Sequence, residues 1–182
     1  MNRKPLALLA SFLLTAVTSL IFSAQGVHAA AVKGGTLYVI THADKLDHAD
    51  PQRIYTGRDI AFMESYVFRT LVMYKPVPGA AGTTLVPDLA TNIGVVSDGG
   101  KTWSFTLKPK VKYSDGSSIV CADIKYAISR TFATDVITGG PSYPLQYLYI
   151  PQDANGNSLY QGPYKKSGQA AYDKAVSCSS DN

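Results

Sequence analysis

The segment spanning residues 87–130 constrains the fold more tightly than any other part of this 182-residue chain. Two runs within it, 92–97 and 102–107, are separated by a glycine-containing turn sequence at 98–101. The second run alternates strictly, with large apolar side chains on one face and hydroxyl side chains on the other. This pattern predicts a β-hairpin, because glycine readily adopts the positive φ that tight hairpin turns require.

A helix is predicted to follow the hairpin, beginning at 120–122 and ending near Phe132. Asp123 in its first turn and Arg130 in its last turn both complement the helix dipole. Its apolar stripe has helical spacing and consists of Ile124, Ala127, Ile128 and Thr131. We expect the apolar face of the hairpin, which carries Trp103, to be buried beneath this helix.

The order of short motifs along this segment resembles the bacterial extracellular solute-binding proteins of family 5. These are the peptide- and nickel-binding receptors of ABC importers. The motifs follow the family's order and spacing through the hairpin, the next turn and the helix. They are Leu89-Ala90, Ser97-Asp98-Gly99, the strand from Trp103 to Lys108, the turn from Tyr113 to Gly116, and Ala122-Asp123-Ile124 with Arg130.

The resemblance implies an α/β chain of mixed α+β character, a fragment of a type II periplasmic-binding-protein-like fold. A hairpin-plus-helix subdomain would then accompany the first strands of lobe I. The continuous apolar run at 37–40 predicts a strand at 36–40 that is buried on both faces, as in a parallel sheet. Because the resemblance covers only the N-terminal part of the family's length, we also expect this strand to lack neighbours and to be exposed.

Residues 1–30 predict an export signal. Arg3 and Lys4 precede an apolar stretch at 6–24, and Val27-His28-Ala29 fits the small-x-small cleavage rule. The apolar stretch approaches membrane-spanning length, so an uncleaved anchor is the alternative. Residues 31–182 would then be the N-terminal part of the solute-binding protein, exported to the periplasm or to the extracellular face of the cell membrane.

The net charge of the chain does not indicate a nucleic-acid partner. Without Arg3 and Lys4, the 17 basic residues fall to 15, against 13 acidic residues. Nucleic-acid binding needs clustered basic side chains. The one cluster present, at Lys108, Lys110 and Lys112, has the alternation of a solvated strand edge, and a docking patch for an acidic partner is its alternative.

The two cysteines, Cys121 and Cys178, are predicted to form a disulfide. An exported protein resides where disulfides persist. Such a bond would attach the C-terminal part of the chain to the start of the helix near Asp123. The alternative is a pair of separate, buried thiols.

Two further helices are predicted outside the central segment, at 58–72 and at 168–176. Apolar residues of the first follow helical spacing at Ile60, Met63, Val67 and Leu71. Between 133 and 149, a glycine pair and two prolines exclude a regular helix through the middle of the segment.

Four residues are candidates for ligand contact through the family resemblance: Tyr55, Thr56, Gly57 and Tyr143. The resemblance implies that the loop after Asp50-Pro51 reaches the ligand cleft, although Tyr55 stands where the family has a charged residue. A Pro-Tyr element approaches the same cleft and corresponds to Tyr143, whose side chain offers a rigid amphipathic contact. The alternative is that the clustered tyrosines pack their loop onto the hairpin. They are Tyr143, Tyr147, Tyr149 and Tyr160.

The loop at 42–50 contains two histidines and three aspartates, which are residue types that bind metals, so a metal site is one interpretation of this loop. The preferred interpretation is a polar loop that ends in an Asp-Pro turn, with no metal. The side chains concerned are His42, Asp44, Asp47, His48 and Asp50.

No catalytic or phosphate-binding motif occurs in the sequence, so we expect neither enzyme activity nor a cofactor. The resemblance implies a monomeric receptor that binds a peptide or another small solute and delivers it to ABC permease subunits in the membrane. The alternatives are a secreted fragment or interaction module without transport, and a receptor for nickel or a metal chelate.

Overall fold

The computed structural model describes residues 33–36, 38–40 and 45–179, and the predicted export signal at 1–30 lies outside them. The chain divides into two units, 1–42 and 43–182. In the first unit, the described residues form neither helix nor strand, and Tyr38 and Ile40 are 86% and 96% exposed. The prediction of a buried strand at 36–40 is therefore wrong for the described residues, whereas the expected exposure is confirmed. A strand needs a neighbour to satisfy its backbone hydrogen bonds.

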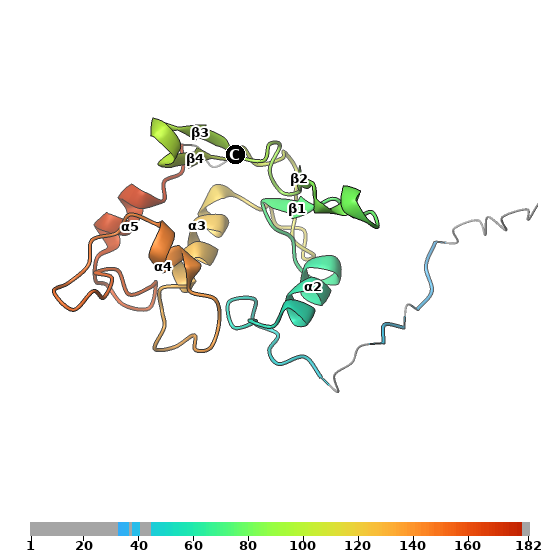
Figure 1. The fold of residues 1–182 in the computed structure, drawn as a ribbon, viewed down its shortest axis with the longest axis horizontal. Coiled ribbons are helices and arrows are strands. Elements are labelled where there is room, and N and C mark those ends of the chain that lie inside the picture. The colour runs from blue at the N-terminus through green and yellow to red at the C-terminus, as the bar shows by residue number, and fades with distance from the viewer. Residues whose placement is uncertain (1–32, 37, 41–44, 180–182) are drawn as a thin grey trace, which may run out of the picture. The chain divides into compact units, whose positions relative to one another are not determined.

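The described part of the second unit contains short helices and two separate two-stranded antiparallel sheets, β1–β2 and β3–β4 (Figure 1). The predicted mixture of helices and strands is confirmed. In chain order the elements are α2 (Gly57–Tyr66), β1 (Val72–Tyr74), the 3-10 turn η1 (Ala80–Thr83), β2 (Leu85–Pro87), β3 (Val95–Ser97), the 3-10 turn η2 (Asp98–Gly100), β4 (Thr102–Ser104), α3 (Cys121–Arg130), α4 (Tyr143–Tyr147) and α5 (Gln169–Ala175).

The predicted hairpin is present as β3–β4, although its strands are shorter than expected. Val96 pairs with Trp103 at the centre of the ladder, and the turn passes through Gly99 at a φ of 63°. An isolated bridge between Ala90 and Leu107 extends the ribbon beyond the two strands. The alternating pattern and the glycine turn therefore identified the hairpin correctly.

The expected burial of this hairpin beneath the helix α3 is wrong. The Trp103 side chain is 58% exposed, and its indole N–H donates to the Gly100 carbonyl over 3.2 Å. Instead of packing beneath α3, the indole lies over Gly94, where a Cβ atom would be 2.8 Å from the ring. The missing side chain of Gly94 gives the indole a packing surface within the ribbon itself.

The Leu89-Ala90 motif lies at the junction between the two sheets. Ala90 is fully buried, and its N–H donates to the Leu71 carbonyl over 3.1 Å, just before β1. The Leu89 carbonyl accepts the N–H of Lys108 over 2.8 Å, just beyond β4. A small residue at position 90 allows the two ribbons to meet closely.

The hydrophobic core lies between α3, α5 and the segment that joins them, and it consists mainly of aromatic rings. Tyr160 and Tyr172 stack with ring centroids 4.4 Å apart, and Phe132 meets both edge-on. The Tyr172 hydroxyl donates to the Lys125 carbonyl on α3, and burial raises its pKa. The buried hydroxyl of Tyr172 therefore has a hydrogen-bond partner on α3, the helix against which the core packs.

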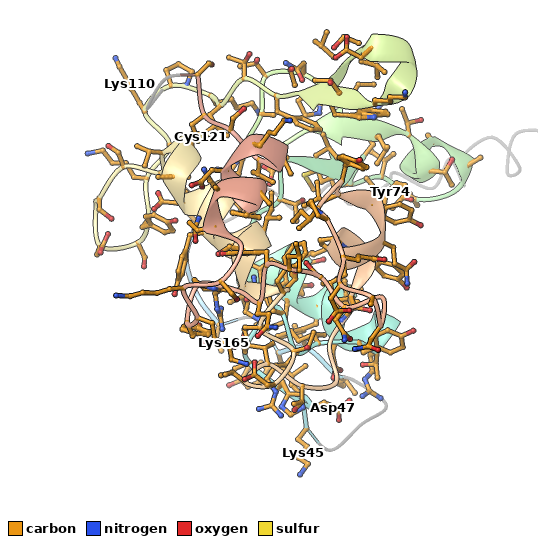
Figure 2. The ribbon with its side chains drawn as sticks, turned by 90° about the vertical axis from the view of Figure 1, so that its left-hand side faces the viewer. Lys45, Asp47, Tyr74, Lys110, Cys121 and Lys165 are labelled. Carbon is orange, nitrogen blue, oxygen red and sulfur yellow. A yellow bond between two sulfur atoms is a disulfide. The ribbon has the colours of Figure 1, made fainter. Side chains whose placement is uncertain are left out.

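The helix α3 begins one residue later than its N-cap Val120, whose N–H donates to the Asp123 carboxylate over 2.9 Å. Valine has no side-chain acceptor, so only this half of a capping box is formed. Cys121, at the start of α3 in Figure 2, is bonded to Cys178 beyond α5. The predicted disulfide is thus confirmed, and the alternative of separate thiols is wrong.

The helix α2 ends at Tyr66, six residues before the predicted end at 72. Asp88, which follows β2, accepts a hydrogen bond from the Arg69 guanidinium over 2.6 Å and from the Thr70 N–H over 3.2 Å. These contacts hold residues 69–70 outside the helix and lead the chain into β1. The apolar periodicity continues past Tyr66, but the Asp88 carboxylate binds the backbone N–H of Thr70, and the helix ends before it.

The lysine cluster is only partly solvated as predicted. Lys110 and Lys112 are exposed, and Lys110 projects away from the chain in Figure 2. Lys108 is half-buried, and its ammonium group donates to the Pro87 carbonyl over 3.4 Å. One member of the cluster therefore takes part in the junction of the two sheets.

Replacing Cys121 and Cys178 together by serine is expected to lower the free energy of unfolding by roughly 4 kcal/mol. The bridge joins residues 57 apart, and its loss restores conformational freedom to the unfolded chain. Urea denaturation of both proteins measures the effect. Reductant should move the wild-type midpoint to that of the double variant and leave the variant unchanged; an unmoved wild-type midpoint would contradict the prediction.

Candidate ligand-binding site

The structure brings together the two segments that were predicted to contact ligand. The Arg53 guanidinium donates to the Thr138 carbonyl over 3.4 Å. At Gly140, a Cβ atom would lie 1.6 Å from the Gln52 carbonyl oxygen, so the two backbones are in direct contact. Tyr55 follows closely on the first segment and Tyr143 on the second, at positions 88 apart in the sequence.

The phenol groups of these two tyrosines interact. The pKa of Tyr143 is raised, first by repulsion from the ionised form of the Tyr55 phenol and second by a hydrogen bond with that phenol. Both side chains remain accessible, with 64% of Tyr55 and 54% of Tyr143 exposed. This tyrosine pair is therefore an exposed aromatic surface with two hydroxyl groups, each able to donate and to accept a hydrogen bond.

The other two predicted contact residues, Thr56 and Gly57, begin the helix α2. Thr56 is its N-cap, and the Thr56 carbonyl accepts the Ile60 N–H over 3.0 Å. Gly57 is its first residue, and both residues are exposed. Their position beside Tyr55 is compatible with ligand contact, and their observed interactions start the helix.

The four clustered tyrosines separate into two groups. Tyr147 and Tyr149 are exposed like Tyr143, and they line a surface hollow of about 420 Å³ formed by residues 145–152. Tyr160 is buried in the core against Tyr172. The alternative that these side chains pack a loop onto the hairpin is therefore wrong, since three face outward and the fourth packs elsewhere.

Asp59 anchors the start of α2 from within the structure. Its fully buried carboxylate accepts the Asp47 N–H over 3.0 Å and the Arg58 guanidinium N–H over 2.9 Å. The hydrogen bond from Asp47, followed by those from Arg58 and Thr56, lowers the pKa of Asp59. The carboxylate thus holds the loop before Tyr55 against the helix after it.

Arg130 makes three long-range polar contacts in the site, which sequence reasoning missed. Its guanidinium donates to Asp50 over 2.6 Å, to Gln52 over 2.5 Å and to the Tyr164 hydroxyl over 3.1 Å. Sequence analysis assigned Arg130 to the helix dipole and to the family motif, without a contact to the turn at 50–53. No pattern within a single sequence links positions 50 and 130, which lie 80 residues apart.

Metal binding at the polar loop finds little support in the described residues. Asp50 forms an ion pair with Arg130, and no group of three potential metal ligands occurs within 33–36, 38–40 and 45–179. His42 and Asp44 lie outside the described residues. Within the same ranges, no helix has the length and apolar character needed to cross a membrane.

Comparison with known proteins gives the class of this chain. Residues 84–173, from the end of η1 into α5, match the bacterial extracellular solute-binding proteins, family 5 Middle. The chain therefore belongs to the family 5 solute-binding proteins. The matched residues include the β3–β4 hairpin, α3 and Tyr143, whereas Tyr55 lies before them.

A solved structure named "Clavulanic acid biosynthesis oligopeptide binding protein 2" is similar to this chain in both sequence and fold. The two are 33% identical with a TM-score of 0.62, over 76% of this chain. The chain spans 23% of the length of that protein. A search of curated proteins gave no match.

Replacing Asp59 by asparagine is expected to destabilise the protein at neutral pH, because the amide places N–H groups against N–H donors. The pKa of Asp59 is lowered in the folded state, so its contribution is present above the ordinary carboxyl value of 3.8 and is lost as the pH falls through the folded value. The difference in unfolding free energy between wild type and variant should therefore shrink on acidification.

Urea denaturation between neutral and acidic pH measures this difference. Glu64→Gln, at an exposed carboxylate on the same helix, is the matched control and should show little change at any pH. A gap between wild type and Asp59→Asn that stays constant with pH would show that Asp59 acts through its shape alone.

Proposed function

We propose that the chain serves in the extracellular substrate-binding component of an ABC transporter, which captures peptides or similar small solutes for import. The observation that carries this proposal is the family 5 match over residues 84–173. The 33% identity to a structure named as an oligopeptide-binding protein favours peptides among the possible solutes. The captured solute passes to permease subunits in the membrane.

The tyrosine pair supports a peptide ligand on chemical grounds. A peptide presents N–H donors and carbonyl acceptors along its backbone, and it carries apolar side chains. Tyr55 and Tyr143 offer exposed rings for the apolar groups and hydroxyls for the polar ones. Affinity then comes from backbone hydrogen bonding and from side-chain pockets, as in other receptors that bind extended peptides.

The receptor acts by binding and domain closure, without catalysis. It captures its solute as a monomer, and the closed form is the state that the permease recognises. No cofactor is needed for this cycle, because partner proteins in the membrane complex hydrolyse ATP. The predicted signal at 1–30 directs the protein to the periplasm or to the extracellular face of the membrane.

A second candidate function is a secreted interaction module without transport. The observation that favours it is the exposed apolar surface of the β3–β4 ribbon, where Val95, Val96 and Trp103 are all about half exposed or more. Such a module would bind another protein through the ribbon and leave the tyrosine pair unused. Peptide binding therefore discriminates between the two candidates.

Replacing Tyr143 by alanine is expected to weaken peptide binding about tenfold, because exposed tyrosines that anchor a ligand commonly contribute more than 1 kcal/mol. Titration calorimetry with an equimolar mixture of tri- to pentapeptides measures the affinity. The protein from the complete reading frame and the 182-residue chain should both be titrated.

Tyr74→Ala is the matched control, since Tyr74 is also exposed, at 64% against 54% for Tyr143, but lies on β1 (Figure 2). It should leave peptide affinity unchanged. Equal affinities of wild type and Tyr143→Ala would remove Tyr143 from the site. The absence of peptide binding by wild-type protein of either length would favour the interaction module.

A further inference from the structure

We propose that Arg130 is a positioning residue for the tyrosine pair. Through Asp50 and Gln52, it holds residues 50–55 on the end of α3, where Tyr55 meets the segment that carries Tyr143. The effect on ligand affinity rests on the proposed function, whereas the effect on the geometry of the pair does not.

The first step is the contact between Arg130 and the turn at 50–53. The Arg130 side chain is 22% exposed, and it bonds the Asp50 carboxylate and the Gln52 side-chain carbonyl at 2.6 and 2.5 Å. Partial burial opposes ionisation of Asp50, but the hydrogen bonds from Arg130 and the Gln52 N–H bring its pKa below the ordinary value. Charge-assisted bonds of this length are about twice as strong as neutral ones.

The second step is the rigidity of the turn itself. The Asp50 side chain accepts the Gln52 N–H over 3.1 Å, and the Asp50 carbonyl accepts the Arg53 N–H over 2.9 Å. The Gln52 amide also donates to the Ala127 carbonyl on α3 over 3.4 Å. Both ends of the Gln52 side-chain amide therefore face α3, and the turn is held there as one piece.

The third step is the close approach of the second segment. The Gln52 carbonyl lies so near to Gly140 that no side chain fits there. The backbone at Gly140 does not have the positive φ that would itself require glycine. The requirement is steric, because the turn and the segment leading to Tyr143 are in direct backbone contact at this point.

These three steps connect Arg130 to a pair of side chains that it does not touch. If the guanidinium is removed, the turn loses its two shortest bonds to α3, while the aromatic core around Tyr172 keeps its own contacts. Tyr55, two residues after the turn, should then separate from Tyr143. A purely structural arginine would change stability without changing this separation.

The experiment reports the Tyr55–Tyr143 distance without any ligand. Tyr143→Cys is labelled with bimane, a fluorophore that a tyrosine phenol quenches on contact. The two natural cysteines are bonded to each other, so only the introduced thiol reacts. Emission should be low when Tyr55 is present and should rise in Tyr55→Leu, which defines the full loss of quenching.

Adding Arg130→Met is expected to raise the emission toward that of Tyr55→Leu, and Arg130→Lys should retain part of the quenching because it keeps the charge. The matched control is Arg69→Met, which removes an ion pair of the same length to Asp88 and leaves the bonds of the turn at 50–53 unchanged. Circular dichroism checks that each protein is folded. If Arg130→Met does not fold, Asp50→Asn breaks the same contact from the other side.

Unchanged quenching in a folded Arg130→Met or Asp50→Asn protein overturns the inference, as does an equal rise in Arg69→Met. Calorimetry with the tri- to pentapeptide mixture adds the functional readout, in which Arg130→Met should bind about tenfold more weakly. If wild-type protein binds no peptide, the proposed function fails, but the fluorescence result still decides the role of Arg130.

Discussion

The packing of Phe132, Tyr160 and Tyr172 is the interaction on which the rest of the second unit depends. The two stacked tyrosines bind α5 and the preceding loop to α3, and the Tyr172 hydroxyl is satisfied by a carbonyl of α3 itself. Aromatic pairs of this geometry add about 0.5–1.5 kcal/mol beyond the area that they bury. With α3 held in this way, its first residue carries the disulfide through Cys121, and its last residue, Arg130, holds the turn before the tyrosine pair.

The features that sequence reasoning predicted correctly are those that neighbouring residues determine. The β3–β4 hairpin follows from alternation around Gly99, and α3 from an apolar stripe with Asp123 at its start. Where the prediction failed, a contact outside the predicted pattern decides the structure. Asp88 ends α2 early by binding residues 69–70 from 18 to 19 positions away, and the indole of Trp103 lies over Gly94 of its own ribbon rather than under a helix.

In the candidate site, too, contacts between distant segments were not predicted from the sequence. Tyr55 and Tyr143 were singled out through a family resemblance, which implied that both approach one cleft but not that their phenol groups would lie together. Their proximity depends on Gly140, whose missing side chain admits the Gln52 carbonyl, and on Arg130. From the sequence, Gly140 was explained as a loop glycine and Arg130 as a basic residue at a helix terminus. Neither explanation predicted the steric role of Gly140 or the ionic role of Arg130.

The two sheets and the α3–α5 core are stabilised in different ways. A two-stranded ribbon is only marginally stable in water, and β1–β2 and β3–β4 each have three residues a strand. They are joined through the buried Ala90, which bonds toward β1 on one side and forms a bridge to Leu107 on the other. The tyrosine pair depends on neither ribbon, because both of its segments are held at the end of α3. The tyrosine pair is thus attached to the aromatic core, and attachment to rigid elements is what a proposed ligand-contact surface requires.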